Sequence, residues 1–150
     1  MNRVIIAVIL LACTLVSLPA VAQDNTRNWE NGAVVVVTEV DTHDGMFNAY
    51  INDLNNVWRR FMEQQMEDGL VLNYGMYSNP SAREGEPDLY LTVTYANWAA
   101  FDTGNEYFEK IGTEIMGSLD DMRNAGLDRS KLRTIMSTQT MQQIVFSDAE

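Results

Sequence analysis

The pattern of apolar and polar positions predicts strands in four places. The β-branched run AVVVVTEV, residues 33–40, is typical of a strand. It is apolar at successive rather than alternate positions, so we expect both of its faces to be covered. Residues 70–78 and 88–95 alternate, as half-buried strands do. Residues 134–146 (TIMSTQTMQQIVF) predict a last strand, with an interruption near residues 137–139.

Two segments between these strands repeat apolar residues at intervals of three and four, which predicts helices with one buried face. The first helix should span about residues 45–67 and stop before Gly69. The second helical region begins at NWAAFD, residues 97–102, breaks near Gly104 and stops at Gly126. The apolar positions of the first helix are Phe47, Tyr50, Ile51, Leu54, Val57, Trp58, Phe61 and Met62.

The order β-α-β-β-α-β over residues 33–146 predicts an α+β, ferredoxin-like domain. Its four-stranded antiparallel sheet should carry both helices on one face. The apolar residues 34–37 and 144–146 indicate that the sheet face without helices is not exposed to solvent. A large apolar sheet face is usually an association surface. The sequence therefore predicts a homodimer with two sheets face to face, a dimeric α+β barrel.

The first residues are typical of a secretory signal peptide. Arg3 precedes an apolar run, Pro19 breaks it, and AVA precedes Gln23, which predicts cleavage after Ala22. The run is short for a transmembrane span, so we expect no membrane insertion after cleavage and a periplasmic or secreted location. In a less favoured alternative, LLAC ending at Cys13 is a lipobox and anchors the chain through a lipid. Cys13 is the only cysteine, so after cleavage the chain would have none.

The chain that follows the predicted signal peptide has three parts. Residues 23–32 should be a flexible leader, residues 33–146 the domain and residues 147–150 a tail. Ten basic and 21 acidic residues give a net charge of −11, and removal of Arg3 gives −12. Phosphate binding needs a basic surface, so we expect no nucleic-acid partner.

The segment EVDTHDG holds the only histidine of the chain and three of its carboxylates. On an extended strand Glu39, Asp41 and His43 would share one side and could hold a divalent cation. Alternatively the segment is a strand end, with Thr42 or Asp44 capping the following helix. We favour the cap and expect no metal site. His43 stays the best candidate for proton transfer, because imidazole changes its charge near neutral pH.

A strip of polar and aromatic residues follows the second and third strands. Its members are Asn73, Tyr77, Tyr90, Thr92 and Thr94. Facing inward, they would give a mostly apolar cavity a few hydrogen-bonding groups, as small-molecule sites have. Tyr90 would then be a second candidate for proton transfer, and the other four would bind the ligand. Alternatively, these residues are simply good strand formers on a half-wet face.

The segments NVWRRF, GLVLNYGMY, DLYLTVTYANWAAFD and QQIVF occur in the order of a known family. Over residues 33–146 the chain resembles the dimeric α+β barrel superfamily, which includes antibiotic-biosynthesis-monooxygenase-like and stress-responsive barrel proteins. More closely, it resembles small exported bacterial proteins of unassigned activity. The resemblance implies the ferredoxin-like fold and the homodimer. Superfamily members include enzymes and non-enzymes, so the fold does not select an activity.

These observations lead to one interpretation and two alternatives. We expect an exported, non-catalytic homodimer that binds a small apolar ligand without a cofactor. In the first alternative, the chain is a cofactor-free monooxygenase-like or isomerase-like enzyme whose apolar substrate lies in the barrel, with His43 or Tyr90 handling protons. In the second, it is a structural or partner-binding module. A polar group in a closed cavity would favour ligand binding, and a cavity filled by side chains would favour the module.

Overall fold

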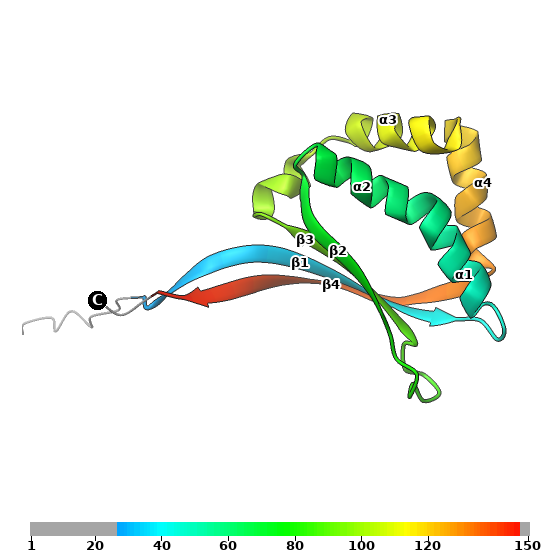
Figure 1. Ribbon diagram of the computed structural model, residues 1–150, viewed down its shortest axis with the longest axis horizontal. Helices are drawn as coiled ribbons and strands as arrows, with labels where there is room; N and C mark the ends of the chain where they lie inside the picture. Colours follow the sequence, from blue (N-terminus) through cyan, green and yellow to red (C-terminus); the bar gives the residue numbers. More distant parts are fainter. Residues whose placement is uncertain (1–26, 148–150) are drawn as a thin grey trace, which may run out of the picture.

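A four-stranded sheet carries the fold in the computed structural model, which describes residues 27–147. The strand order is β2-β3-β1-β4, and all neighbouring strands are antiparallel. This is the predicted ferredoxin-like sheet, and the helices lie on one of its faces (Figure 1). The predicted signal peptide with its cleavage site, the lipid anchor at Cys13 and residues 148–150 of the tail lie outside the described residues. The strands are β1 (Trp29–Thr42), β2 (Val71–Ser78), β3 (Leu89–Tyr95) and β4 (Arg133–Phe146).

Strands β1 and β4 extend past the rest of the sheet as a two-stranded arm, residues 29–33 and 143–146. Pairing of β1 with β3 ends at Val34, whereas pairing of β1 with β4 continues to Trp29 and Phe146. The arm projects beyond the helices (Figure 1). Strand β1 thus begins before the predicted start at Ala33, and residues 29–32 belong to the strand rather than to a flexible leader.

The first helical stretch runs without interruption over residues 47–67, close to the predicted 45–67. It consists of α1 (Phe47–Asp53), the π-helix η1 (Leu54–Trp58) and α2 (Arg59–Glu67). Its apolar side packs against the sheet in two adjoining clusters, and Trp58 contacts both of them. The first cluster is Val40, Tyr50, Leu54, Leu89 and Leu91, and the second is Met62, Val71 and Val93.

The second helical region is divided into the 3₁₀-helix η2 (Trp98–Asp102), α3 (Asn105–Met116) and α4 (Leu119–Ser130). Gly117 separates α3 from α4 with φ of +106°, a conformation that favours glycine. The predicted stop at Gly126 is therefore wrong, because Gly126 lies inside α4. None of the helices among residues 27–147 has the length and apolar character needed to cross a bilayer.

Strand β4 is continuous where the sequence suggested an interruption near residues 137–139. A register shift lies between the pairs Glu39–Ser137 and Val40–Ile135, so one β4 residue, Met136, is bulged out of the ladder. The strand therefore bends without ending, and it remains paired with β1 over its length.

Candidate functional site

The sheet face that points away from the helices, here called the open face, presents three rows of side chains. Leu89, Leu91 and Val93 of β3 are buried on the helix side, so the residues between them point the other way. Strand pairing then extends each row over β2, β3, β1 and β4. The rows are Tyr77-Tyr90-Glu39-Ser137, Gly75-Thr92-Val37-Gln139 and Asn73-Thr94-Val35-Met141.

The structure brings Tyr90 and all the predicted ligand-binding residues together on the open face. Tyr77 stands opposite Tyr90, and Asn73 stands opposite Thr94. Tyr77 is 60% exposed, whereas Tyr90, Thr92 and Thr94 are half-buried. The expectation that these side chains share one face is met by the register, and their binding roles stay predictions.

Gly75 leaves room on the open face for the ring of Tyr77. A Cβ atom at Gly75 would lie 3.2 Å from Cε2 of Tyr77 and 3.1 Å from Oγ1 of Thr92. These distances are shorter than ordinary contacts, so a larger residue here would push against Tyr77 or Thr92. The glycine therefore lets the Tyr77 ring lie close to the sheet, beside the polar strip.

Glu39 supplies a carboxylate in the first row of the open face. Its Oε2 accepts a hydrogen bond of 2.7 Å from the hydroxyl of Ser137, and its Oε1 accepts one of 3.1 Å from Nε2 of Gln139. The sequence suggested Glu39 only as a metal ligand. Its partners are about one hundred residues away along the chain, and only strand pairing brings them together.

His43 follows the last residue of β1 and packs against the turn between α4 and β4. The side-chain alternation of the strand therefore does not extend to His43, and it does not align with Glu39 and Asp41 as the sequence suggested. Its Nδ1 lies 2.9 Å from the carbonyl oxygen of Lys131, and its Nε2 lies 3.1 Å from Oγ1 of Thr134. A carbonyl oxygen only accepts, so Nδ1 carries a proton and donates it. The imidazole therefore joins the end of β1 to the start of β4, and its role in proton transfer stays a prediction.

The predicted helix cap is wrong. Met46 occupies the N-cap position of α1, and no side chain caps this end of the helix. Thr42 instead contacts Asp88, next to the start of β3: its backbone N–H donates to Oδ1 at 3.0 Å and its hydroxyl donates to Oδ2. No group of three or more His, Cys, Asp or Glu residues that could hold a metal occurs within residues 27–147.

Replacing His43 by alanine should lower the free energy of unfolding by about 1 kcal/mol, because the variant loses both hydrogen bonds to the α4–β4 turn. Urea-induced unfolding followed by circular dichroism measures the change. His43→Asn is the matched control, because its amide can still donate to the Lys131 carbonyl and should lose less. Equal stability of His43→Ala and the parent protein would show that the turn does not hold the imidazole.

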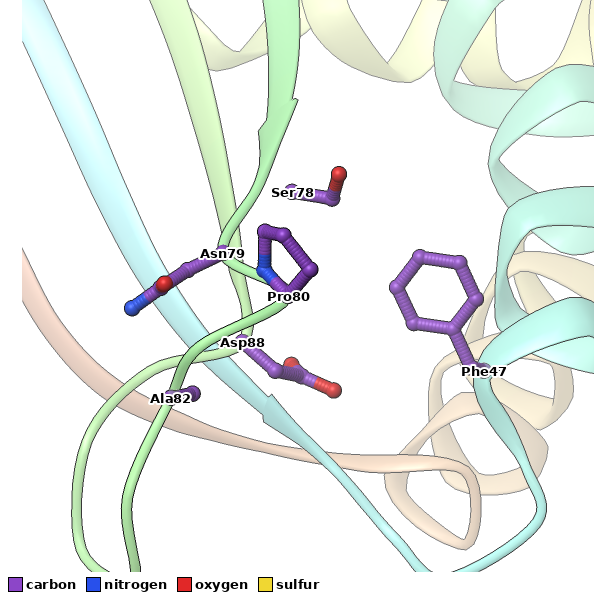
Figure 2. Close-up of a pocket in the computed structure, with 6 residues that line it drawn as sticks. All are labelled: Phe47, Ser78, Asn79, Pro80, Ala82 and Asp88. Atoms are coloured by element: carbon purple, nitrogen blue, oxygen red, sulfur yellow. The ribbon is translucent and has the colours of Figure 1, made fainter.

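A second candidate site is an open pocket of about 460 Å³ between α1 and the loop that joins β2 to β3. The ring of Phe47 faces Pro80 across it, and Asp88 lies below them (Figure 2). The volume is in the range of small-molecule sites. Both oxygens of Asp88 already bind Thr42, however, so its carboxylate serves the strand end. None of the predicted site residues lines this pocket.

Two tyrosines with altered acidity lie away from the open face. Burial raises the pKa of Tyr95, whose ring packs against Phe101 with centroids 5.0 Å apart. Burial, and then the hydrogen bond to Asp68 and its charge, raise the pKa of Tyr107. The Tyr107 hydroxyl donates to Oδ2 of Asp68 at 2.8 Å and ties α3 to the turn before β2. Both phenols stay neutral at physiological pH and serve the packing around α3 and η2.

Comparison with known proteins identifies the fold. No family model matches the chain, and no curated protein matches its sequence. A crystal structure of a protein from Shewanella oneidensis is similar, with a TM-score of 0.50 and 14% identity over 78% of this chain and 98% of that one. This likeness confirms the predicted resemblance at the level of the fold.

Two further solved structures are similar at lower TM-scores. One is a dimeric ferredoxin-like protein from an uncultured marine organism, with a TM-score of 0.48 and 9% identity over 81% of this chain and 93% of that one. The other is a candidate antibiotic biosynthesis monooxygenase from Chloroflexus aurantiacus, with a TM-score of 0.45 and 13% identity over 74% of this chain and 92% of that one.

Proposed function

We propose that this chain is an exported, non-catalytic protein that forms a two-fold homodimer and binds a small, largely apolar molecule between two open faces. The observation that carries the proposal is the make-up of the open face. Val35, Val37 and Met141 lie on it beside the strip of tyrosine, threonine and asparagine side chains. None of the helices among residues 27–147 covers this face (Figure 1).

The apolar part of this surface supports the dimer. Met141 is 46% exposed, and Val145 of the arm, four residues further along β4 and therefore on the same face, is 44% exposed. Contiguous apolar surface on a soluble protein usually marks a contact with another molecule. A second copy of the same chain would cover both sheets in one symmetric contact, because each sheet presents the same face to the other.

The polar part of the same face supports ligand binding. Small-molecule sites are mostly apolar, with a few fixed polar groups. In the proposed dimer, Tyr77, Tyr90 and Thr92 would supply such groups to a space between the sheets. Because Gly75 has no side chain, the Tyr77 ring can lie close to the sheet beside these polar groups. An interface packed only for stability would carry fewer polar side chains on this face, because burying a polar group costs free energy unless it is hydrogen-bonded.

The remaining parts of the proposal rest on His43 and on the first residues of the chain. Both ring nitrogens of His43 make hydrogen bonds to the α4–β4 turn, which supports a structural rather than a catalytic histidine. The signal-peptide pattern of residues 1–22 supports export to the periplasm or beyond.

Light scattering and native mass spectrometry on residues 23–150, purified from the native host, test the proposal together. At micromolar concentration we expect about twice the monomer mass, with a small molecule retained in the complex under native conditions. A control spectrum under denaturing conditions should show the chain alone. A clean monomer would contradict the proposed dimer. A dimer without a retained small molecule would contradict the proposed ligand binding.

A further inference from the structure

We infer that the ligand of the open face is an organic cation, a protonated amine on an apolar or aromatic body, and that Glu39 binds its ammonium group. The inference rests on the proposed function, and it adds the chemical class of the ligand and the residue that selects it. It comes from the first row of the open face, where Tyr77, Tyr90 and Glu39 stand side by side across three strands.

The carboxylate of Glu39 is fixed in place but retains unused acceptor capacity. Ser137 and Gln139 each donate one hydrogen bond to it, one to each oxygen. An ionised carboxylate can accept about four hydrogen bonds, so two of its acceptor positions are free of protein partners among residues 27–147. Within the same residues, no lysine, arginine or histidine nitrogen lies within 4.0 Å of this carboxylate. Glu39 can therefore accept hydrogen bonds from a cationic ligand, and no basic side chain among residues 27–147 already forms an ion pair with it.

The two neighbouring tyrosines complete a site of the kind that recognises ammonium groups. Tyr90 stands directly opposite Glu39 on β3, and Tyr77 stands opposite Tyr90 on β2. Side chains at directly opposed positions of antiparallel strands are in contact range. Aromatic faces attract cations through their quadrupole, and a carboxylate beside them adds a charge-assisted hydrogen bond.

The proposed dimer strengthens the preference for a cation. Two-fold symmetry brings a second Glu39 to the same space, so that two carboxylates face one interior. The open-face rows contain no basic residue to balance them. Two unbalanced carboxylates in a partly dry space attract an ammonium group and repel carboxylate ligands such as fatty acids.

Three naphthalene probes that differ only in one group test the inference: naphthalen-1-ylmethylamine, naphthalen-1-ylmethanol and 1-naphthoate. Isothermal titration calorimetry at neutral pH measures their affinities for the exported protein. We expect the amine to bind about tenfold or more tightly than the alcohol, and the carboxylate to bind most weakly, because a charge-assisted hydrogen bond is worth about one power of ten in affinity.

Glu39→Gln should abolish the preference while keeping the shape of the side chain. The affinity for the amine should fall about tenfold, and the affinity for the alcohol should change less than about twofold. Glu106→Gln is the matched control: it makes the same substitution at an exposed position in the first turn of α3, away from the open face, and should leave both affinities unchanged. Should Glu39→Gln fail to fold, Ser137→Ala, which removes one of the two hydrogen bonds that hold the carboxylate in place, should still reduce the preference for the amine.

The outcomes separate this inference from the proposed function. Equal binding of all three probes, unchanged in Glu39→Gln, would overturn the inference and leave the apolar binding function standing. Preference for the amine in a protein that is monomeric would support Glu39 and contradict the dimer. A dimer that binds none of the probes would overturn the inference and count against the binding function as well.

Discussion

Replacing Val37 by aspartate should convert the proposed dimer to a monomer at micromolar concentration. Val37 lies in the middle row of the open face, between Thr92 on β3 and Gln139 on β4. In a face-to-face dimer, each copy would bury one new carboxylate without a partner, and Glu39 on the same strand face would repel it. Burial of an unpaired charge costs several kcal/mol, so the dimer should weaken by about a hundredfold or more. Sedimentation velocity measures the mass.

Thr140→Asp is the matched control for this variant. Thr140 pairs with β1 at Val36, on the helix side of the sheet, and its side chain is exposed. The Thr140→Asp substitution introduces the same charge into the same sheet but outside the proposed interface, so this variant should remain a dimer. Val37 belongs to neither core cluster, so the monomer should keep its circular dichroism spectrum. A folded Val37→Asp protein that stays dimeric would show that the open faces do not meet.

Local patterns predicted the elements of this fold well, because each strand and helix of the core buries one face over several turns or residues. They missed features that depend on distant partners. The start of β1 at Trp29 is one such feature, since only pairing with Phe146 makes those residues a strand. A purely local signal was also overlooked at the break between α3 and α4. The Oγ of Ser118 accepts a hydrogen bond of 3.1 Å from the backbone of Asp121, and Ser-x-x-Asp is a recognisable cap pattern.

The candidate site was predictable along each strand but not across the sheet. Alternation placed Tyr90, Thr92 and Thr94 on one face, and the structure agrees. Alternation alone does not say which residue of β1 or β4 stands beside them. Glu39 gains its place next to Tyr90 from the register of β1 with β3, and its hydrogen bonds from the register with β4. Those registers depend on packing against the helices rather than on any neighbour in the sequence.

Replacing Leu54 by alanine should lower the free energy of unfolding by about 3 kcal/mol. Leu54 is 2% exposed and lies in the first core cluster with Val40, Leu89 and Leu91. The truncation loses buried apolar contacts and leaves a cavity that the rigid sheet cannot fill. Urea-induced unfolding at one fixed protein concentration measures the loss, because the stability of the proposed dimer would depend on concentration.

The matched control is Leu127→Ala on α4, where the side chain is 59% exposed and the loss should be under about 0.5 kcal/mol. The comparison also bears on the site, because Leu54 packs on the strand residue next to Glu39. The helical stretch covers Val40, so Glu39 must point to the open face. A one-residue slip of β1 would exchange those two positions and bury a carboxylate under the helices. Equal losses in the two variants would mean that Leu54 does not pack there, and the open face would then need a different set of residues.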